Sequence, residues 1–192
     1  MINIVKKSLE SNIDVTSKIV NDENFLRKIE NISEHIIETL NNGNTVFTCG
    51  NGGSMADALH FTAELVGRFR SNRTSLPSIT LGTNASNISA IANDFGYNKV
   101  FSRELSGLAS RGDILVFFST SGNSDNIIEA IKVSQDLGIK VVAFLGEKLT
   151  DYEGSLDFTV HIPSTETPRI QELHTLIFHS ICEIIDQRLS SP

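Results

Sequence analysis

The stretch that decides the fold is Ile114-Leu115-Val116-Phe117-Phe118-Ser119-Thr120-Ser121-Gly122-Asn123-Ser124. Its first five residues are all apolar, which is typical of a strand buried on both faces. A hydroxyl-rich turn follows at once, and a helical pattern begins near Asp125. This strand–loop–helix order is the repeating unit of a parallel α/β fold.

The same alternation extends outward in both directions along the chain. Four more short apolar runs are predicted as strands: residues 45–49, 77–81, 140–145 and 158–162. Helical patterns lie around and between them: residues 55–69, 85–93, 100–109, 125–137 and 169–189. The pattern predicts a three-layer α/β sandwich with a five-stranded parallel sheet in flavodoxin-like order. Such sheets bind ligands where the strand order reverses, which points to the loops after the first and third strands.

Residues 1–42 carry apolar positions at helical spacing and predict one or two amphipathic helices, interrupted near Asn21-Asp22. Asn41-Asn42-Gly43 is a typical helix end. No shift in composition divides the chain. We therefore expect a single domain over residues 1–192, with residues 1–42 as an N-terminal helical arm that serves packing or oligomerisation.

Composition narrows the class of protein. The chain has 192 residues, is 40% apolar and 20% charged, and has a net charge of −7. That charge argues against a broad nucleic-acid footprint, and no apolar run is long enough for a membrane span. Cys49 and Cys182 match no disulfide framework or metal motif, and Cys49 is interpreted as a small buried hydrophobe. We expect a cytoplasmic protein that binds neither nucleic acid nor membrane.

The turn at residues 119–124 has the composition of a phosphate site. It offers four hydroxyls, a flexible glycine and the N-terminus of a helix, where free N–H groups and the helix dipole attract an anion. It lacks the Gly-Lys-Ser/Thr of a nucleotide-binding P-loop, so ATP is not implied. The alternative is a polar turn in which a serine caps the helix.

A second loop, Gly50-Asn51-Gly52-Gly53-Ser54, also joins a strand to a helix. Met55 stands where a dinucleotide fingerprint needs its third glycine, and Gly82-Thr83-Asn84 replaces the acidic ribose contact. A nucleotide-dependent oxidoreductase is therefore disfavoured. The glycines fit close approach to a small polar ligand. For Ser54 and Asp57, a helix-capping pair is the simpler interpretation.

Polar side chains with catalytic potential occur on two predicted helices. His60 and Glu64 are four residues apart and share one helix face, which suits either a metal pair or a simple helix-face pair. The last helix adds Gln171, Glu172, His174 and His179 to an apolar segment, where buried polar groups need partners. Aldose–ketose isomerisation needs a base that carries a proton between C1 and C2, and an acid or metal at the enediolate oxygens. One carboxylate, one imidazole and Zn²⁺ would suffice.

Taken together, these residues resemble the phosphoheptose isomerases, a branch of the SIS (sugar isomerase) family. The similarity covers nearly the whole chain and is strongest at residues 49–54, 60–68, 92–96, 119–124 and 169–172. The Ser119–Ser124 motif alone is common to SIS domains. His60, Glu64, Gln171 and His179 make the resemblance specific to this branch.

The resemblance implies conversion of sedoheptulose 7-phosphate to D-glycero-D-manno-heptose 7-phosphate by enediol proton transfer, for ADP- or GDP-heptose and surface polysaccharide. It implies that Glu64 and His179 are the acid–base pair. The implied substrate-binding residues are Asn51, Gly52, Gly53, Glu64, Asn93, Asp94, Ser119, Thr120, Ser121, Ser124 and Gln171. It further implies one Zn²⁺ per subunit, held by His60, Glu64, Gln171 and His179, in a homotetramer with shared active sites.

Helix geometry limits how the implied zinc ligands can be arranged in one chain. Gln171 and His179 are eight residues apart, about 12 Å of rise and roughly 80° of turn on a straight helix. Zinc ligands reach the metal at about 2 Å, so either the helix is irregular or the two residues serve sites of different subunits, which we favour. Pro168 stands where some relatives have an acidic residue, and it receives no role.

A second function class is a non-catalytic SIS protein, either a DnaA-associating replication regulator or a phosphosugar sensor. Such an adaptor would not need an acid–base pair, so Glu64 and His179 favour the enzyme.

Overall fold

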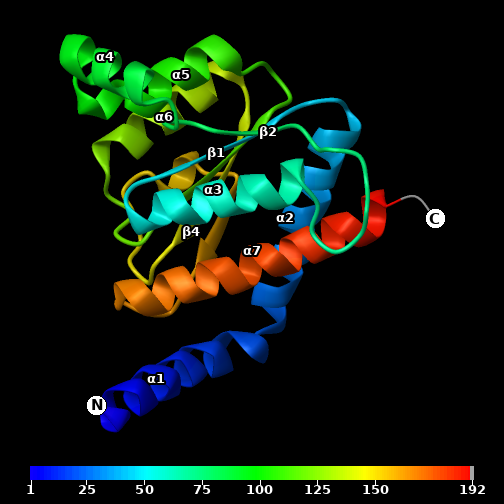
Figure 1. Ribbon diagram of the computed structural model, residues 1–192, viewed down its shortest axis with the longest axis vertical. Helices are drawn as coiled ribbons and strands as arrows, with labels where there is room; N and C mark the ends of the chain where they lie inside the picture. Colours follow the sequence, from blue (N-terminus) through cyan, green and yellow to red (C-terminus); the bar gives the residue numbers. More distant parts are fainter. Residues whose placement is uncertain (191–192) are drawn as a thin grey trace.

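Five parallel strands form one sheet in the computed structural model, which describes residues 1–190 (Figure 1). The strands are β1 (Val46–Gly50), β2 (Ser78–Thr80), β3 (Ile114–Ser119), β4 (Lys140–Leu145) and β5 (Phe158–His161). Their order across the sheet is β2-β1-β3-β4-β5, so the order reverses between β1 and β3. The predicted flavodoxin-like parallel sheet is confirmed. The loops after β1 and β3 leave the sheet next to each other, at the place where such folds bind ligands.

Helices cover both faces of this sheet (Figure 1). One layer contains α2 (Glu23–Asn41), α3 (Gly53–Val66) and α7 (Thr167–Leu189). The other contains α4 (Ala85–Phe95), α5 (Val100–Leu108) and α6 (Asp125–Leu137). Side chains of β3 alternate between the two layers: Phe118 packs with the first and Phe117 with the second. The three-layer sandwich predicted from the alternation of strands and helices is thus confirmed.

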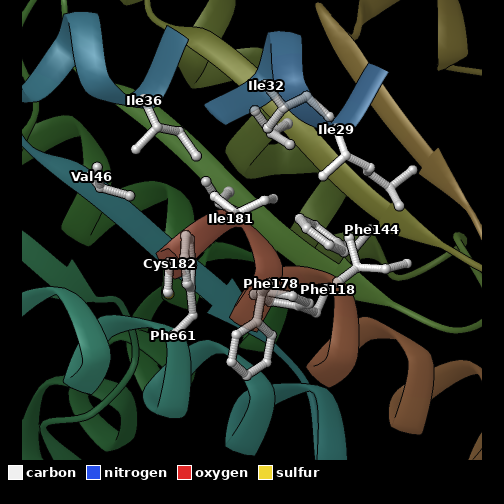
Figure 2. Close-up of a cluster of buried hydrophobic side chains, with 14 of the residues drawn as sticks. Ile29, Ile32, Ile36, Val46, Phe61, Phe118, Phe144, Phe178, Ile181 and Cys182 are labelled. Carbon is white, nitrogen blue, oxygen red and sulfur yellow. The ribbon is translucent and has the colours of Figure 1, made fainter. Parts of the chain in front are cut away.

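The first layer encloses the larger apolar cluster (Figure 2). Phe61 of α3 and Phe178 of α7 meet Phe118 and Phe144 of the sheet, and Ile32 of α2 lies on the same cluster. All five side chains are fully buried. Each contributes about 1.5–3 kcal/mol on transfer from water, so this cluster fixes α3 and α7 against the sheet.

The ends of α3 differ from the predicted range of 55–69. Gly52 occupies the N-cap with φ +58°, a conformation that glycine adopts without strain, and the helix begins at Gly53. At the other end Gly67 is the C-cap, and its N–H donates to the carbonyl of Ala63 at 2.9 Å. The helix is therefore shifted toward the loop after β1, which brings that loop and the helix N-terminus together.

Residues 1–42 form two helices, α1 (Ile2–Val20) and α2, with the break at the predicted position. Asp22 caps α2 by accepting hydrogen bonds from the backbone N–H groups of Asn24 (3.0 Å) and Phe25 (3.1 Å). The two helices differ in burial: α2 is part of the core layer, whereas α1 buries only Val15 and Ile19. It lies at the lower edge of Figure 1 and contacts α7 through Asn12, which donates to Glu172 at 2.7 Å. Only α1 has the exposure of an arm.

Within residues 1–190, none of the helices combines the length and the apolarity needed to cross a membrane. Cys49 and Cys182 are buried and free, as expected for Cys49, and burial raises the pKa of both thiols.

Candidate functional site

The loops after β1 and β3 are tied together by amide side chains. Asn51, directly after β1, and Asn126, in the first turn of α6, exchange two hydrogen bonds of 2.9 Å. The hydroxyl of Tyr97 also donates to Asn51, at 3.3 Å. Asn51 and the Ser119–Ser124 loop, two parts of the predicted site, therefore lie at one place on the sheet edge.

Hydrogen bonds to buried groups fix the Ser119–Ser124 loop, whereas the side chain of Ser121 is exposed to solvent. Buried Ser119 accepts a hydrogen bond from the Gly122 N–H at 3.1 Å, and the Tyr152 hydroxyl donates to the Gly122 carbonyl at 2.5 Å. Gly122 has φ +65°, so glycine is required at this turn. Ser124 is the N-cap of α6, but its side chain makes no capping hydrogen bond. The alternative of a serine-capped turn is thus not observed, which leaves this hydroxyl available to a ligand.

Thr120 and Ser121 line a hollow of about 200 Å³. Lys148, Thr167 and the carboxylate of Glu147 also line it. Hydroxyls and a lysine are donors that suit a phosphate, and the N-terminus of α6 follows the same loop.

The first glycine loop makes a close approach to α7. A Cβ on Gly53 would meet the side-chain amide of Gln171, so the absence of a side chain at Gly53 gives this amide its present position. The expected capping pair is wrong: within residues 1–190 no side chain caps α3, and Asp57 instead accepts a hydrogen bond from Thr175 of α7 at 3.3 Å. The reason is that α7 packs beside α3 and supplies the partner.

His60, Glu64 and His179 form a cluster between α3 and α7. His60 Nε2 lies 3.1 Å from Glu64 Oε1 and 3.3 Å from His179 Nε2. One ligand atom from each residue lies within 4.8 Å of the others. Two imidazoles and a carboxylate form a donor set that suits Zn²⁺, so these residues fit the expected metal.

The fourth expected ligand, Gln171, is in contact with the start of α3. It lies eight residues before His179 on α7, which is an unbroken helix, and its amide is beside Gly53. The irregular-helix alternative is therefore not observed. One chain brings His60, Glu64 and His179 together, and the Gln171 amide lies beside Gly53 at the start of α3.

The cluster is partly open to solvent. The side chain of His60 is 46% exposed and that of Glu64 is 21% exposed. Partial burial, with the neighbouring His60, lowers the pKa of His179 below its usual range, while Glu64 acts in the opposite direction. His179 is thereby favoured in its neutral form, which can accept a proton or bind a metal.

Asp57 is a site residue that the sequence interpretation assigned only to capping. It is buried, Oδ2 has no hydrogen-bond partner in the described part of the chain, and burial raises its pKa to about 6. Its hydrogen bond with Thr175 and the nearby His60 oppose that rise. A buried carboxylate without full compensation is costly and is most often retained at a functional site. Its spacing from His60 and Glu64, three and seven residues, could have indicated a shared helix face.

Asn93 and Asp94 lie apart from these groups. Both are exposed on α4, and Asn93 donates to Asp94 at 2.8 Å. Among the described residues neither forms a hydrogen bond to the loops after β1 or β3, so their contact with substrate stays a prediction.

Comparison with known proteins identifies the family of the chain. Residues 10–146 match the SIS domain family. A phosphoheptose isomerase of Aliarcobacter butzleri is 46% identical over 187 residues, covering 97% of each chain. Solved phosphoheptose isomerases of Francisella tularensis and Neisseria gonorrhoeae superpose with TM-scores of 0.91 and 0.89, at 33% and 34% identity. They cover 97% and 96% of this chain, and 98% of each solved chain is matched. This chain therefore belongs to the phosphoheptose isomerases, within the SIS domain family.

Proposed function

We propose that this chain converts sedoheptulose 7-phosphate to D-glycero-D-manno-heptose 7-phosphate, for ADP- or GDP-heptose and surface polysaccharide. The observation that carries the proposal is the contact of Glu64 and His179 through His60, on two helices that start beside a phosphate-type loop. Relatives with the same family name cover almost the full chain.

The loop after β3 would hold the substrate phosphate with Ser119, Thr120, Ser121 and Ser124. Asn51, Gly52 and Gly53, with Asn93 and Asp94, would line the sugar chain, and Gln171 would contact the sugar in the site that it shares with a neighbouring subunit. In this arrangement the end of the sugar opposite to the phosphate would lie beside α3 and α7, which carry Asp57, His60, Glu64 and His179.

Glu64 and His179 would transfer the proton. One of the two groups would remove a proton from C1 of the ketose to form the enediolate, and would return it at C2. The other group would move a proton between the carbonyl oxygen and the hydroxyl oxygen. No net oxidation occurs, because the hydrogen removed from C1 is balanced by the one gained at C2.

We further propose one Zn²⁺ per subunit, held by His60, Glu64 and His179, with Gln171 as the fourth ligand. When bound, the ion would polarise the substrate carbonyl. Because the Gln171 amide lies beside Gly53, eight residues before His179 on α7, the proposal includes a homotetramer in which Gln171 serves the site of a neighbouring subunit. We place the reaction in the cytoplasm, where two free thiols stay reduced.

Substitution of Glu64 by Gln tests the acid–base pair. The change keeps side-chain volume and removes the base, so turnover of sedoheptulose 7-phosphate should fall by at least about 100-fold. The thermal unfolding midpoint should stay near that of the parent protein. Glu183→Gln is the matched control, because Glu183 is an acid of α7 that pairs with exposed Arg70. Retention of parental turnover by Glu64→Gln would show that the base is assigned wrongly.

Removal of metal tests the zinc site. Protein dialysed against a chelator should lose isomerase activity and regain it on addition of Zn²⁺, with about one ion bound per chain by elemental analysis. Full activity in metal-free protein would refute the need for zinc. Absence of conversion both with and without metal would favour the non-catalytic adaptor. An adaptor would have no need of the acid–base pair Glu64 and His179.

A further inference from the structure

We propose that Arg73 is a positioning residue for Glu64, acting through a buried ion pair with Asp186 that locks the end of α3 to α7. This inference rests on the proposed isomerase function. Arg73 belongs to the loop after α3, which passes beside the C-terminal end of α7 (Figure 1). No role for Arg73 or Asp186 follows from the sequence motifs.

The ion pair is almost completely removed from water. Arg73 Nε lies 3.1 Å from Asp186 Oδ1, and the two side chains are 3% and 4% exposed. The second carboxylate oxygen, Oδ2, accepts from the backbone N–H groups of Ser71 (2.6 Å) and Arg70 (3.3 Å). Burial raises the pKa of Asp186, but these hydrogen bonds outweigh burial and hold the pKa below its usual range. Asp186 is therefore a fixed anion that orders the loop.

The guanidinium also reaches the backbone of the proposed base. Arg73 Nη2 donates to the carbonyl of Glu64 at 2.7 Å, and Nη1 donates to the carbonyl of Leu65 at 2.9 Å. These carbonyls lie in the last turn of α3, where no further helical N–H is available. A cation at this end also complements the helix dipole. Arg73 thus determines where the last turn of α3, with Glu64, sits.

The anchor on the other side lies on the helix that carries His179. Asp186 follows His179 by seven residues, which is about two turns and returns to nearly the same face of α7. The path from Glu64 through Arg73 and Asp186 to α7 is therefore short and made of charge-assisted hydrogen bonds. It fixes the separation of the two proposed proton-transfer groups without touching substrate.

Loss of the Arg73–Asp186 ion pair should lower kcat more than it changes KM. The phosphate loop after β3 is remote from the ion pair, so substrate binding should remain. A displacement of about 1 Å can cost roughly 100-fold in rate.

Arg73→Met alone would leave Asp186 buried and unpaired, which is strongly destabilising. The double variant Arg73→Met/Asp186→Asn avoids this, since the introduced amide keeps an oxygen acceptor for the Ser71 N–H but carries no charge.

The experiment measures kcat and KM for sedoheptulose 7-phosphate together with the thermal midpoint. We expect the double variant to fold, with kcat reduced by about tenfold or more and KM within about threefold. Arg73→Lys keeps the charge but lacks the planar fork that reaches Asp186 and both carbonyls at once, so it should fall between the double variant and the parent. Arg70→Gln is the matched control: it removes an exposed ion pair between the same loop and α7, and should leave kcat unchanged.

A folded double variant with parental kcat would overturn the positioning role, and so would an equal loss in Arg70→Gln. If Arg73→Met alone lost activity and the double variant regained it fully, Arg73 would serve stability only. Failure of the parent protein to turn over the substrate would instead contradict the proposed function, so the two failures are distinguishable.

Discussion

Asp57 shows how a single buried charge can reveal a site. Its pKa is raised to about 6 from 3.8, first by burial, so the folded protein binds its proton more tightly than the unfolded chain. Stability from this group is present in full below about pH 4 and is lost as the pH rises to about 6 and beyond. At neutral pH the ionised carboxylate therefore destabilises the fold, and its position where α3 packs on α7 makes it a candidate site residue.

Asp57→Asn should accordingly stabilise the protein at pH 7.5. The expected gain is on the order of 1–3 kcal/mol in the free energy of unfolding, since one pKa unit corresponds to about 1.4 kcal/mol. Near pH 4 the gain should almost vanish, because the carboxyl is then largely protonated in the folded state and no longer a buried charge. Chemical denaturation of chelator-treated protein at the two pH values measures this difference. An equal gain at both pH values would contradict the raised pKa.

Among the elements, α2 has a role different from that of α1. Ile32 and Ile36 of α2 are fully buried against the sheet, whereas the apolar residues in the first half of α1 are exposed. Residues 1–42 share one helical pattern in the sequence, so the division between a core helix and a protruding helix is a property of packing. The break at Asn21-Asp22, capped by Asp22, allows α1 to leave the layer.

Ile32→Ala tests whether α2 belongs to the core. A truncated side chain in the cluster of Figure 2 should lower the free energy of unfolding by about 2–5 kcal/mol. Leu108→Ala is the control on α5, where the side chain is 55% exposed, and should cost no more than about 0.5 kcal/mol. Denaturant unfolding of both variants gives the comparison. A small effect of Ile32→Ala would show that α2 packs only loosely.

In the molecule as a whole, α1 carries a stripe of exposed apolar side chains. Ile2, Val5, Leu9 and Ile13 recur at spacings of three and four residues and are 61–86% exposed. A stripe of this kind on a helix normally packs against another surface. In the proposed homotetramer it would be covered by a neighbouring subunit, which would also bring the separated Gln171 to a second site.

Leu9→Lys should weaken this assembly. A charge in the apolar stripe opposes association, so light scattering should show a smaller mass for the variant than for the parent. If sites are shared between subunits, isomerase activity per chain should fall with the mass. Lys7→Glu changes charge on the opposite side of the same helix and should affect neither. Undiminished mass and activity in Leu9→Lys would contradict an interface at this stripe.

Much of the site was visible in the sequence because local chemistry encodes it. The apolar strand and hydroxyl turn at residues 114–124 predicted both the parallel sheet and the phosphate-type loop, and His60 and Glu64 were placed on one helix face by spacing alone. The contacts of Asp57, Gln171 and Arg73 were not predicted. Each of these side chains finds its partner on an element distant in sequence: Thr175 for Asp57, Gly53 for Gln171 and Asp186 for Arg73.

The order and type of the helices and strands could be obtained from the sequence, as could the reversal between β1 and β3. The sequence also identified the polar residues beside these strands. Periodicity, caps and turns act over a few residues, so a linear pattern contains them. The packing of α3 beside α7 decided which carboxylate is desolvated, which three ligands meet, and how the end of α3 is held. Those properties depend on distances between helices, which arise only when both are packed on the same sheet.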